Sequence, residues 1–215
     1  MAKSKAVENF LPPVVKTYYI RKGYTTRERN EAFDDTPYTD EFQNPVYLEA
    51  RRILEENNYN GVVDIGCGSG FKLLKYFSDR QTCGIDITPT VNWLRAKYPF
   101  RMWLAVPLTR ATNFGNSFQM AIASDIIEHL PDPDLLMTFI AAANFQRAII
   151  STPERDLLAE AFPNVHSKNG PPTNKHHVRE WNQQEFEKYI SHHFEIEAHY
   201  IVDKFTQVVE IKCQQ

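Results

Sequence analysis

The chain has 215 residues, of which 42% are hydrophobic, and its 27 acidic and 24 basic side chains give a formal net charge of -3. These values fit a globular protein and argue against the broad basic face of a nucleic-acid-binding domain, although a local basic patch remains compatible with them. Because the N-terminus has no apolar signal segment, no apolar run approaches about 20 residues and the three cysteines are scattered, we expect a cytoplasmic protein without a membrane span.

We interpret residues 1–60 as an N-terminal extension that caps the substrate. Residues 1–30 carry seven basic and two acidic side chains, whereas residues 31–60 carry two basic and eight acidic ones. A helix is predicted over 44–58, where Pro45 suits a first turn and apolar residues recur near helical spacing. These apolar residues are Val46, Leu48, Ile53 and Leu54. The aromatic residues of the extension either line a substrate pocket or form the core of the cap: Tyr18, Tyr19, Tyr24, Phe33, Tyr38 and Phe42.

From residue 61 onward, short apolar strands alternate with helices, which predicts crossover units and a parallel sheet buried on both faces. The predicted strands are 61–66, 82–87, 100–105, 118–124 and 147–152, and the predicted helices are 70–78, 90–98 and 132–145. A further helix begins at Asn182, with Glu185 three residues later as in a capping box. Two strand-like segments then flank a short turn and predict a terminal antiparallel hairpin.

The stretch VVDIGCGSG, residues 62–70, joins the first strand to a helix. In open α/β folds such a turn lies where ligands bind, and its glycines allow close approach of a ligand to backbone N–H groups. Asp86 follows 20 positions after Gly66, a spacing that suits a carboxylate bonded to ribose hydroxyls. The spacing is G-x-G-x-G rather than that of dinucleotide-binding turns, and Asp64 suits a ligand with an amino group. The alternative is a turn that only packs the helix on the strand.

A second group of polar residues, in SDIIEHLPDPD, follows the fourth predicted strand. On a helical turn, Asp125 would lie near Glu128 and His129. Two carboxylates and an imidazole can ligate Mg²⁺ or Mn²⁺, which would lower the pKa of a substrate hydroxyl. Two alternatives remain: His129 acts as a metal-free general base, or Glu128 and His129 only support the loop.

The later loop NGPPTNKHHVREW, residues 169–181, contains His176, His177 and Arg179. These side chains either face the cleft or lie exposed in solvent. Its prolines and Gly170 predict irregular structure, so periodicity does not decide between the two.

The motifs VVDIGCGSG, GIDI and ASDIIEHLPDPD together resemble those of class I S-adenosylmethionine-dependent methyltransferases, over residues 60–215. This resemblance implies a Rossmann-like, seven-stranded, mostly parallel sheet that the terminal hairpin completes, with the cap in front of a methyltransferase domain at 61–215. It implies that Asp64 and the glycines flank the methionine part of the cofactor and that Asp86 holds the ribose. The expected cofactor-binding residues are Asp64, Gly66, Cys67, Gly68, Gly70, Asp86, Ile87, Leu108 and Ser124.

One position departs from the family pattern. Pro107 stands where the family usually has an acid that contacts the adenine amine, so we expect Val106 and Leu108 to hold adenine by backbone and apolar contact.

The stretch from STP (151–153) to HVREW (177–181) also resembles two metal-using branches of the family and a third group. These are the ubiquinone-biosynthesis O-methyltransferases, the small-RNA 3′-terminal 2′-O-methyltransferases and the sugar and natural-product methyltransferases. The second branch adds a later histidine ligand, which would be His177 or, in reserve, His176. The expected metal ligands are Asp125, Glu128, His129 and His177, and the expected catalytic residues are His129 and His177.

The leading functional hypothesis is O-methylation of a small hydroxylated metabolite, sugar or glycan precursor. One alternative is 2′-O-methylation at the 3′ end of small RNA, which would need a basic surface that only residues 1–30 offer. A second alternative is a non-catalytic protein that binds S-adenosylmethionine. The sequence does not identify the methyl acceptor.

Overall fold

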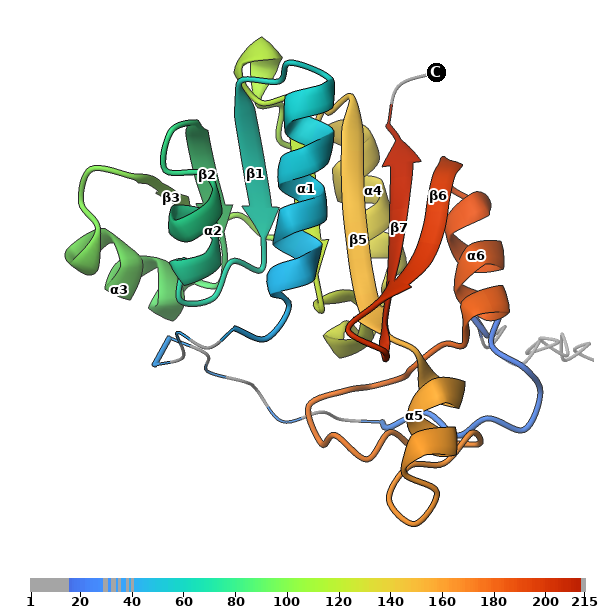
Figure 1. The fold of residues 1–215 in the computed structure, drawn as a ribbon. Coiled ribbons are helices and arrows are strands. Elements are labelled where there is room, and N and C mark those ends of the chain that lie inside the picture. Colours follow the sequence, from blue (N-terminus) through green and yellow to red (C-terminus); the bar gives the residue numbers. More distant parts are fainter. Residues whose placement is uncertain are drawn as a thin grey trace, which may run out of the picture.

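The computed structural model describes residues 16–28, 31, 34, 36–37, 39 and 41–213. Its centre is a seven-stranded sheet with the strand order β3-β2-β1-β4-β5-β7-β6 (Figure 1). The first five strands are parallel, and β7 pairs antiparallel with both β5 and β6. The predicted Rossmann-like sheet with a C-terminal antiparallel hairpin is therefore confirmed. The strands are β1 Gly61–Ile65, β2 Gln81–Ile85, β3 Met102–Leu104, β4 Met120–Ser124, β5 Arg147–Pro153, β6 Glu195–Val202 and β7 Thr206–Lys212.

Helices cover both faces of this sheet, as a parallel sheet requires. They are α1 Asn44–Glu56, α2 Phe71–Tyr76, α3 Thr88–Lys97, α4 Asp134–Ala142, α5 Arg155–Ala161 and α6 Gln183–Ser191, with short 3-10 turns η1 Gly115–Ser117 and η2 Ile127–His129. Alternate residues of β4 supply the two cores, since Met120 and Ile122 pack with α1, α2 and α3, whereas Ala121 and Ala123 pack with α4 and α6. None of the helices in the described ranges has the length and apolar character that crossing a membrane requires.

The helix α1 belongs to one of these layers and corrects part of the predicted organisation. Its buried residues form a stripe at helical spacing: Val46, Tyr47, Ala50, Ile53 and Leu54. Leu48, which we assigned to the apolar face, is instead 52% exposed. The boundary that we predicted between residues 60 and 61 would separate α1 from the sheet on which it packs. The helix therefore belongs to the core and not to a cap. Phe33 and Tyr38 lie outside the described residues.

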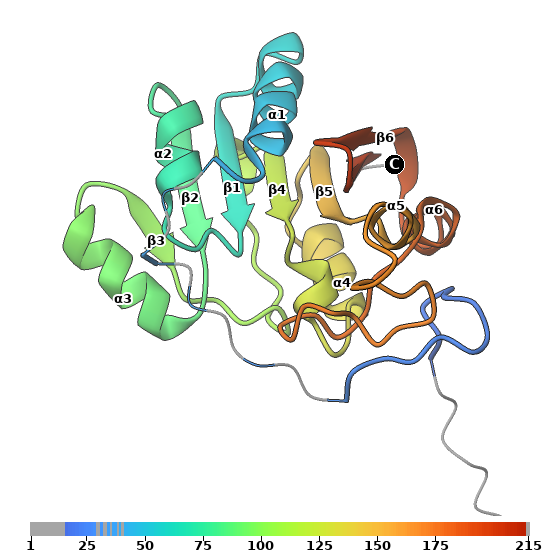
Figure 2. The same ribbon diagram turned by 60° about the horizontal axis from the view of Figure 1, so that its bottom comes forward.

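The turns that follow β1, β2, β4 and β5 all lie at the same edge of the sheet, where parallel strands end (Figure 2). The capping box of Asn182 and Glu185 opens α6 as predicted, with hydrogen bonds in both directions. By contrast, α5 was not predicted, because its segment begins directly after β5 without a separating loop. The helix α5 and the loop between α5 and α6 cover part of this edge (Figure 1).

Candidate active site

The glycine turn after β1 is shaped by close contacts that exclude larger residues. Gly66 has a φ of 77°, and a Cβ there would lie 2.6 Å from Ile126 Cδ1. Gly70 has a φ of 66°, and a Cβ there would lie 2.7 Å from the Trp103 ring. Both positions combine a left-handed backbone with no room for a side chain. Gly70 thus permits close packing against Trp103, and Gly66 permits close packing against Ile126.

The carboxylate of Asp86 joins this turn to the end of β2. Its Oδ2 accepts a 2.8 Å hydrogen bond from the Gly68 N–H, and its Oδ1 accepts a 2.7 Å bond from the Ile87 N–H. Burial raises the pKa of Asp86 above its ordinary value, and the backbone donors oppose this shift. The side chain is therefore held at the mouth of the cavity beside it, as a ribose-binding carboxylate would be.

That space, which we call the β2–β3 cavity, has a volume of about 620 Å³. Its lining is mainly apolar and comes from β1, from the ends of β2 and β3 and from the loop after β4: Ile65, Gly66, Ile85, Asp86, Ile87, Thr88, Pro89, Ala105, Val106, Pro107, Leu108, Ile126 and Leu130. Ile87 is 61% exposed, and an apolar ligand surface in this cavity would account for its position. Val106 and Leu108, which we expect to contact adenine, both line this cavity.

A second space, the β4–β5 cavity, has a volume of about 360 Å³ and a more polar lining. The residues are Phe42, Gln43, Tyr47, Gly66, Cys67, Ser69, Lys72, Ser124, Asp125, Glu128, His129, Pro153, Asn174, His176 and His177. Gly66 lines both cavities, so both border the glycine turn.

Asp64 lies apart from both cavities. Its side chain is 1% exposed within β1, and one oxygen accepts a 2.9 Å hydrogen bond from the Tyr47 hydroxyl. It lines neither cavity, so the structure gives it a place beneath the turn rather than a direct approach to a ligand amine. Cys67 and Ser124, also expected at the cofactor, do line the β4–β5 cavity.

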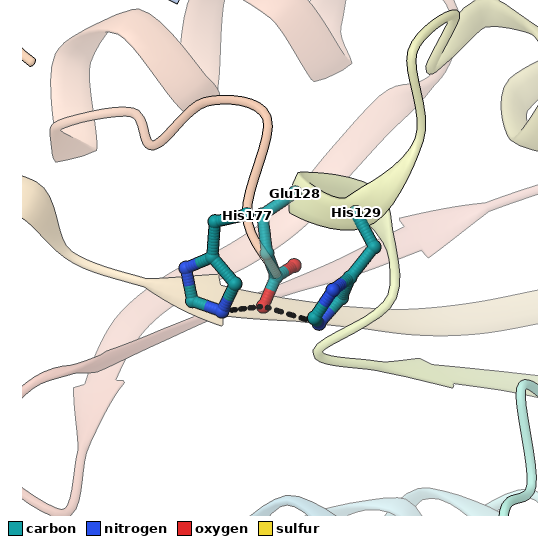
Figure 3. Close-up of side chains that lie close together, drawn as sticks. All are labelled: Glu128, His129 and His177. Carbon is teal, nitrogen blue, oxygen red and sulfur yellow. Dashed lines mark ion pairs between the residues drawn. The ribbon is translucent and has the colours of Figure 1, made fainter. Parts of the chain in front are cut away.

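Three predicted metal ligands meet at one wall of the β4–β5 cavity (Figure 3). The Oε1 atom of Glu128 lies 4.0 Å from His129 Nε2 and 3.9 Å from His177 Nε2. All three ligand atoms lie within 4.8 Å of one another. Two atoms that share an ion at roughly 2.1 Å lie at most about 4.2 Å apart, so a contraction of some tenths of an ångström would complete the set.

Hydrogen bonds fix which nitrogen of each imidazole faces the cluster. His129 Nδ1 lies 2.8 Å from the His176 carbonyl oxygen, which only accepts, so this nitrogen carries the proton. His177 Nδ1 donates in the same way to Glu180 Oε1 at 2.7 Å. Because the proton of each ring is on Nδ1, the lone pair is on Nε2, the nitrogen that lies nearer to Glu128. This arrangement is typical of metal-binding histidines.

Asn174 supports this assignment and competes with a metal. Its Oδ1 accepts from the His176 N–H, so its Nδ2 is the atom that donates to His177 Nε2 at 2.9 Å. An ion bound to His177 would have to displace this amide.

Glu128 itself is fully buried. Its Oε2 accepts from the Thr152 hydroxyl at 3.0 Å, whereas its Oε1 accepts no hydrogen bond from the described residues. Burial, followed by the nearby Asp125, raises the pKa of Glu128 well above its ordinary value. Burial, followed by His177, lowers the pKa of His129 to about 4, so this imidazole is neutral at pH 7. The cluster therefore brings together three potential ligand atoms at a place where burial disfavours the charged form of Glu128 and of His129.

Asp125 does not join the cluster as predicted. Its carboxylate accepts hydrogen bonds of 2.7 Å from the Ser151 hydroxyl and 2.9 Å from Gln43 Nε2. The prediction assumed a helical turn from 125, but Asp125 has a left-handed φ of 50° and only Ile127–His129 form a 3-10 turn. Asp125 is therefore not one of the three residues of the cluster, although it lines the same cavity.

His176 and Arg179 also have positions that the sequence left open. The half-buried His176 donates from Nδ1 to the Glu31 carbonyl at 3.0 Å and lines the cavity. Arg179 is 4% exposed and does not face the cleft, since its guanidinium donates to the carbonyls of Leu130 and Pro131. It thus ties the loop after β4 to the loop before α6.

The Methyltransferase domain family matches residues 42–198, which is most of the chain. The chain belongs to this family. It is a class I S-adenosylmethionine-dependent methyltransferase and therefore an enzyme. A search of the curated proteins finds no match to this chain.

Solved structures with the same fold include the methyltransferase domain of bacterial CtHen1. It has 20% identity and a TM-score of 0.60, and the alignment covers 80% of this chain and 100% of that one. The magnesium protoporphyrin IX methyltransferase ChlM from Synechocystis PCC 6803, solved with bound SAH, has 16% identity and a TM-score of 0.60, with 79% and 82% covered. The small RNA methyltransferase HEN1 has 19% identity and a TM-score of 0.60, with 88% of this chain and 27% of that chain covered.

Several residues of the methyltransferase site were not predicted from the sequence. Gln43, Tyr47, Lys72 and Asn174 all line the β4–β5 cavity. Only Tyr47 had a usable signal, its place on the apolar stripe of α1. The others are isolated polar residues at the ends of elements, and their convergence depends on how α1 and the later loop pack at the sheet edge.

Proposed function

We propose that this methyltransferase transfers a methyl group to a hydroxyl oxygen of an acceptor in the β4–β5 cavity, with a divalent metal held by Glu128, His129 and His177. One observation carries the proposal: the buried Glu128 Oε1 accepts no hydrogen bond among the described residues and faces the Nε2 atoms of both histidines. Three acceptor atoms so arranged suit a cation.

The cofactor end of the proposal rests on the glycine turn. S-adenosylmethionine, when bound, supplies the electrophilic methyl group. Gly66 lines both cavities, and the Asp86 carboxylate, which lines the β2–β3 cavity, would bind the ribose hydroxyls. The apolar wall near Leu108 would hold the adenine. The residues that line the β4–β5 cavity would then orient the acceptor hydroxyl toward the methyl group, and this alignment alone accelerates transfer strongly.

One carboxylate and two imidazoles fit Mn²⁺ or a similar transition-metal ion better than Mg²⁺, which prefers oxygen ligands. An ion bound there would lower the pKa of the acceptor hydroxyl. Glu128 would supply the negative charge and the two histidines neutral nitrogen ligands. In a metal-free reaction, the neutral His129 Nε2 would accept the hydroxyl proton as a general base, because burial keeps its pKa near 4 and its Nδ1 is already committed to the His176 carbonyl.

We favour a small hydroxylated metabolite, sugar or glycan precursor as the acceptor. The cavity of about 360 Å³ suits a small molecule, and Lys72 is the single lysine or arginine among its lining residues. A phosphate-rich acceptor would need more basic residues at this mouth.

The second candidate is the 2′-hydroxyl at the 3′ end of a small RNA. It is supported by the Glu-His-His cluster and by the fold shared with CtHen1 and with HEN1, a small RNA methyltransferase. A single terminal ribose would fit the cavity while the rest of the RNA lies outside it.

The test is methyl transfer from labelled S-adenosylmethionine to two acceptor sets, a panel of sugars and hydroxylated metabolites and a short RNA with a free 3′ end. Each is measured with chelator and with added Mg²⁺ or Mn²⁺. A 2′-deoxy 3′ end is the control for the RNA. Transfer that needs the metal supports the metal centre, and full activity in chelator contradicts it. Cofactor binding without any transfer would favour the non-catalytic alternative.

A further inference from the structure

We propose that Arg27 is a positioning residue that holds His177 in the cluster from outside the cavity. Residues 16–28, which we call the strap, run beside the loop that leads into α6 (Figure 2). This inference rests on the proposed metal role of His177, and it assigns a specific task to part of the N-terminal extension.

The contacts of Arg27 concentrate on the residues around His177. Its guanidinium donates from Nε to the His177 carbonyl at 3.3 Å and from a terminal nitrogen to the Pro172 carbonyl at 2.6 Å. Its backbone N–H donates to the Val178 carbonyl at 2.8 Å. One half-buried residue of the strap therefore binds the main chain at His177, at the next residue and at the start of the same loop.

The same loop is bound on its other side by the residue that carries the carboxylate. The Val178 N–H donates to the Glu128 carbonyl at 2.8 Å. Val178 thus lies between Arg27 and Glu128, so the strap, the His177 loop and η2 form three adjacent layers. Arg27 and Glu128 both bind the backbone of Val178, the residue after His177. A shift of the strap would therefore change the distance between His177 and Glu128.

A neighbouring strap residue supports the histidine ring. The Tyr24 hydroxyl accepts from the Glu180 N–H at 2.9 Å, and the Glu180 carboxylate accepts from His177 Nδ1 at 2.7 Å. The strap also approaches Gly170 so closely that a Cβ there would overlap the Thr25 carbonyl. The strap therefore fixes both the backbone and, through Glu180, the ring orientation of His177.

Such support matters because the loop has little regular structure of its own. The segment from Pro171 to Arg179 forms turns and bends rather than a helix or strand. Metal sites tolerate displacements of only about 0.5 Å, so a ligand on this kind of loop needs partners that hold it.

The experiment compares R27A with R21A in the full chain. Arg21 is a matched control because it is an arginine of the same strap that bonds to Lys168 and Asn169, away from His177. Co²⁺ is titrated by its visible absorption, and S-adenosylhomocysteine is titrated by calorimetry. We expect R27A to bind Co²⁺ about 10-fold or more weakly, as outer-shell changes typically do, with unchanged S-adenosylhomocysteine affinity and with R21A like wild type.

Wild-type Co²⁺ affinity in a folded R27A would overturn the inference. If R27A no longer binds S-adenosylhomocysteine, R27M, which keeps the length of the side chain but has no donor, is compared with R21A in the same titrations, and wild-type Co²⁺ affinity there overturns it equally.

A second readout separates this inference from the metal proposal. Long-range ¹H–¹⁵N spectra of the metal-free protein report which His177 nitrogen carries the proton. If wild-type protein binds no Co²⁺, the metal proposal fails, and the spectra decide the inference. A defined Nδ1–H signal that is lost in R27A but kept in R21A supports positioning, whereas an unchanged signal in R27A rejects it.

Discussion

The two sides of the active site are built in different ways. On the cofactor side, the glycine turn and Asp86 come from two neighbouring βα connections, and their geometry follows from residues close in sequence. On the acceptor side, Glu128 and His129 meet a histidine almost 50 positions later, which the strap holds from about 150 positions earlier. A local motif can specify the first kind of site, whereas the second exists only after several distant segments have packed.

The largest expected effect tests whether the acceptor side is a metal centre. E128Q should lower affinity for Co²⁺ or Mn²⁺ by at least about 100-fold, beyond the roughly 10- to 100-fold typical of outer-shell changes, because it removes the single anionic ligand of the cluster. D125N is the matched control, since the Asp125 carboxylate bonds to Ser151 and Gln43 instead. S-adenosylhomocysteine affinity should stay unchanged in both. Equal metal loss in D125N would place Asp125 back among the ligands.

The next effect tests the independence of the cofactor side. D86A should weaken S-adenosylhomocysteine binding by about 10- to 150-fold, which corresponds to losing a charge-assisted hydrogen bond of roughly 1.5–3 kcal/mol. P107A should change it far less, because Pro107 offers only apolar contact. Calorimetry measures both, and Co²⁺ titration should show wild-type metal affinity. A metal defect in folded D86A would show that the two sides are coupled.

The pH dependence of cofactor binding tests the role of Asp86 in a second way. Burial raises the pKa of Asp86, and the protonated side chain would lose its role as an anionic acceptor. Affinity for S-adenosylhomocysteine should therefore fall as the pH decreases through this raised pKa, by up to about 10-fold per pH unit. D86N, which has no titrating group there, should bind more weakly at neutral pH and lack this dependence. An identical pH profile in D86N would assign the effect to another group.

The smallest effect concerns Asn174. Its amide donates to the His177 nitrogen that an ion would use, so N174A should raise Co²⁺ affinity by about 2- to 10-fold, the equivalent of one ordinary hydrogen bond. T173A, which alters a neighbouring residue bonded to the Val165 carbonyl, serves as the control. Weaker metal binding in N174A would mean that the amide supports the site rather than competing for it.

The sequence was sufficient to predict the mostly parallel sheet with its terminal hairpin and the glycine turn, because both depend on short-range sequence patterns. It placed Glu128, His129 and His177 in one group, but it included Asp125 by assuming a helical turn. A left-handed residue at 125 cannot be read from an aspartate alone, since the conformation is set by the Ser151 and Gln43 contacts. The role of α1 was likewise misjudged, because an amphipathic helix before the first strand can pack on the sheet or stand apart from it.

The position of β7 has a consequence for how the protein is made. This strand lies between β5 and β6, and its residues from Thr206 to Ile211 are buried. Synthesis from the N-terminus therefore produces β6 before the strand that joins β6 to the sheet. Until residue 212 has left the ribosome, β5 remains an open edge, and exposed edges of this kind invite aggregation. Chaperone binding to nascent chains should consequently persist until β7 is inserted beside β5.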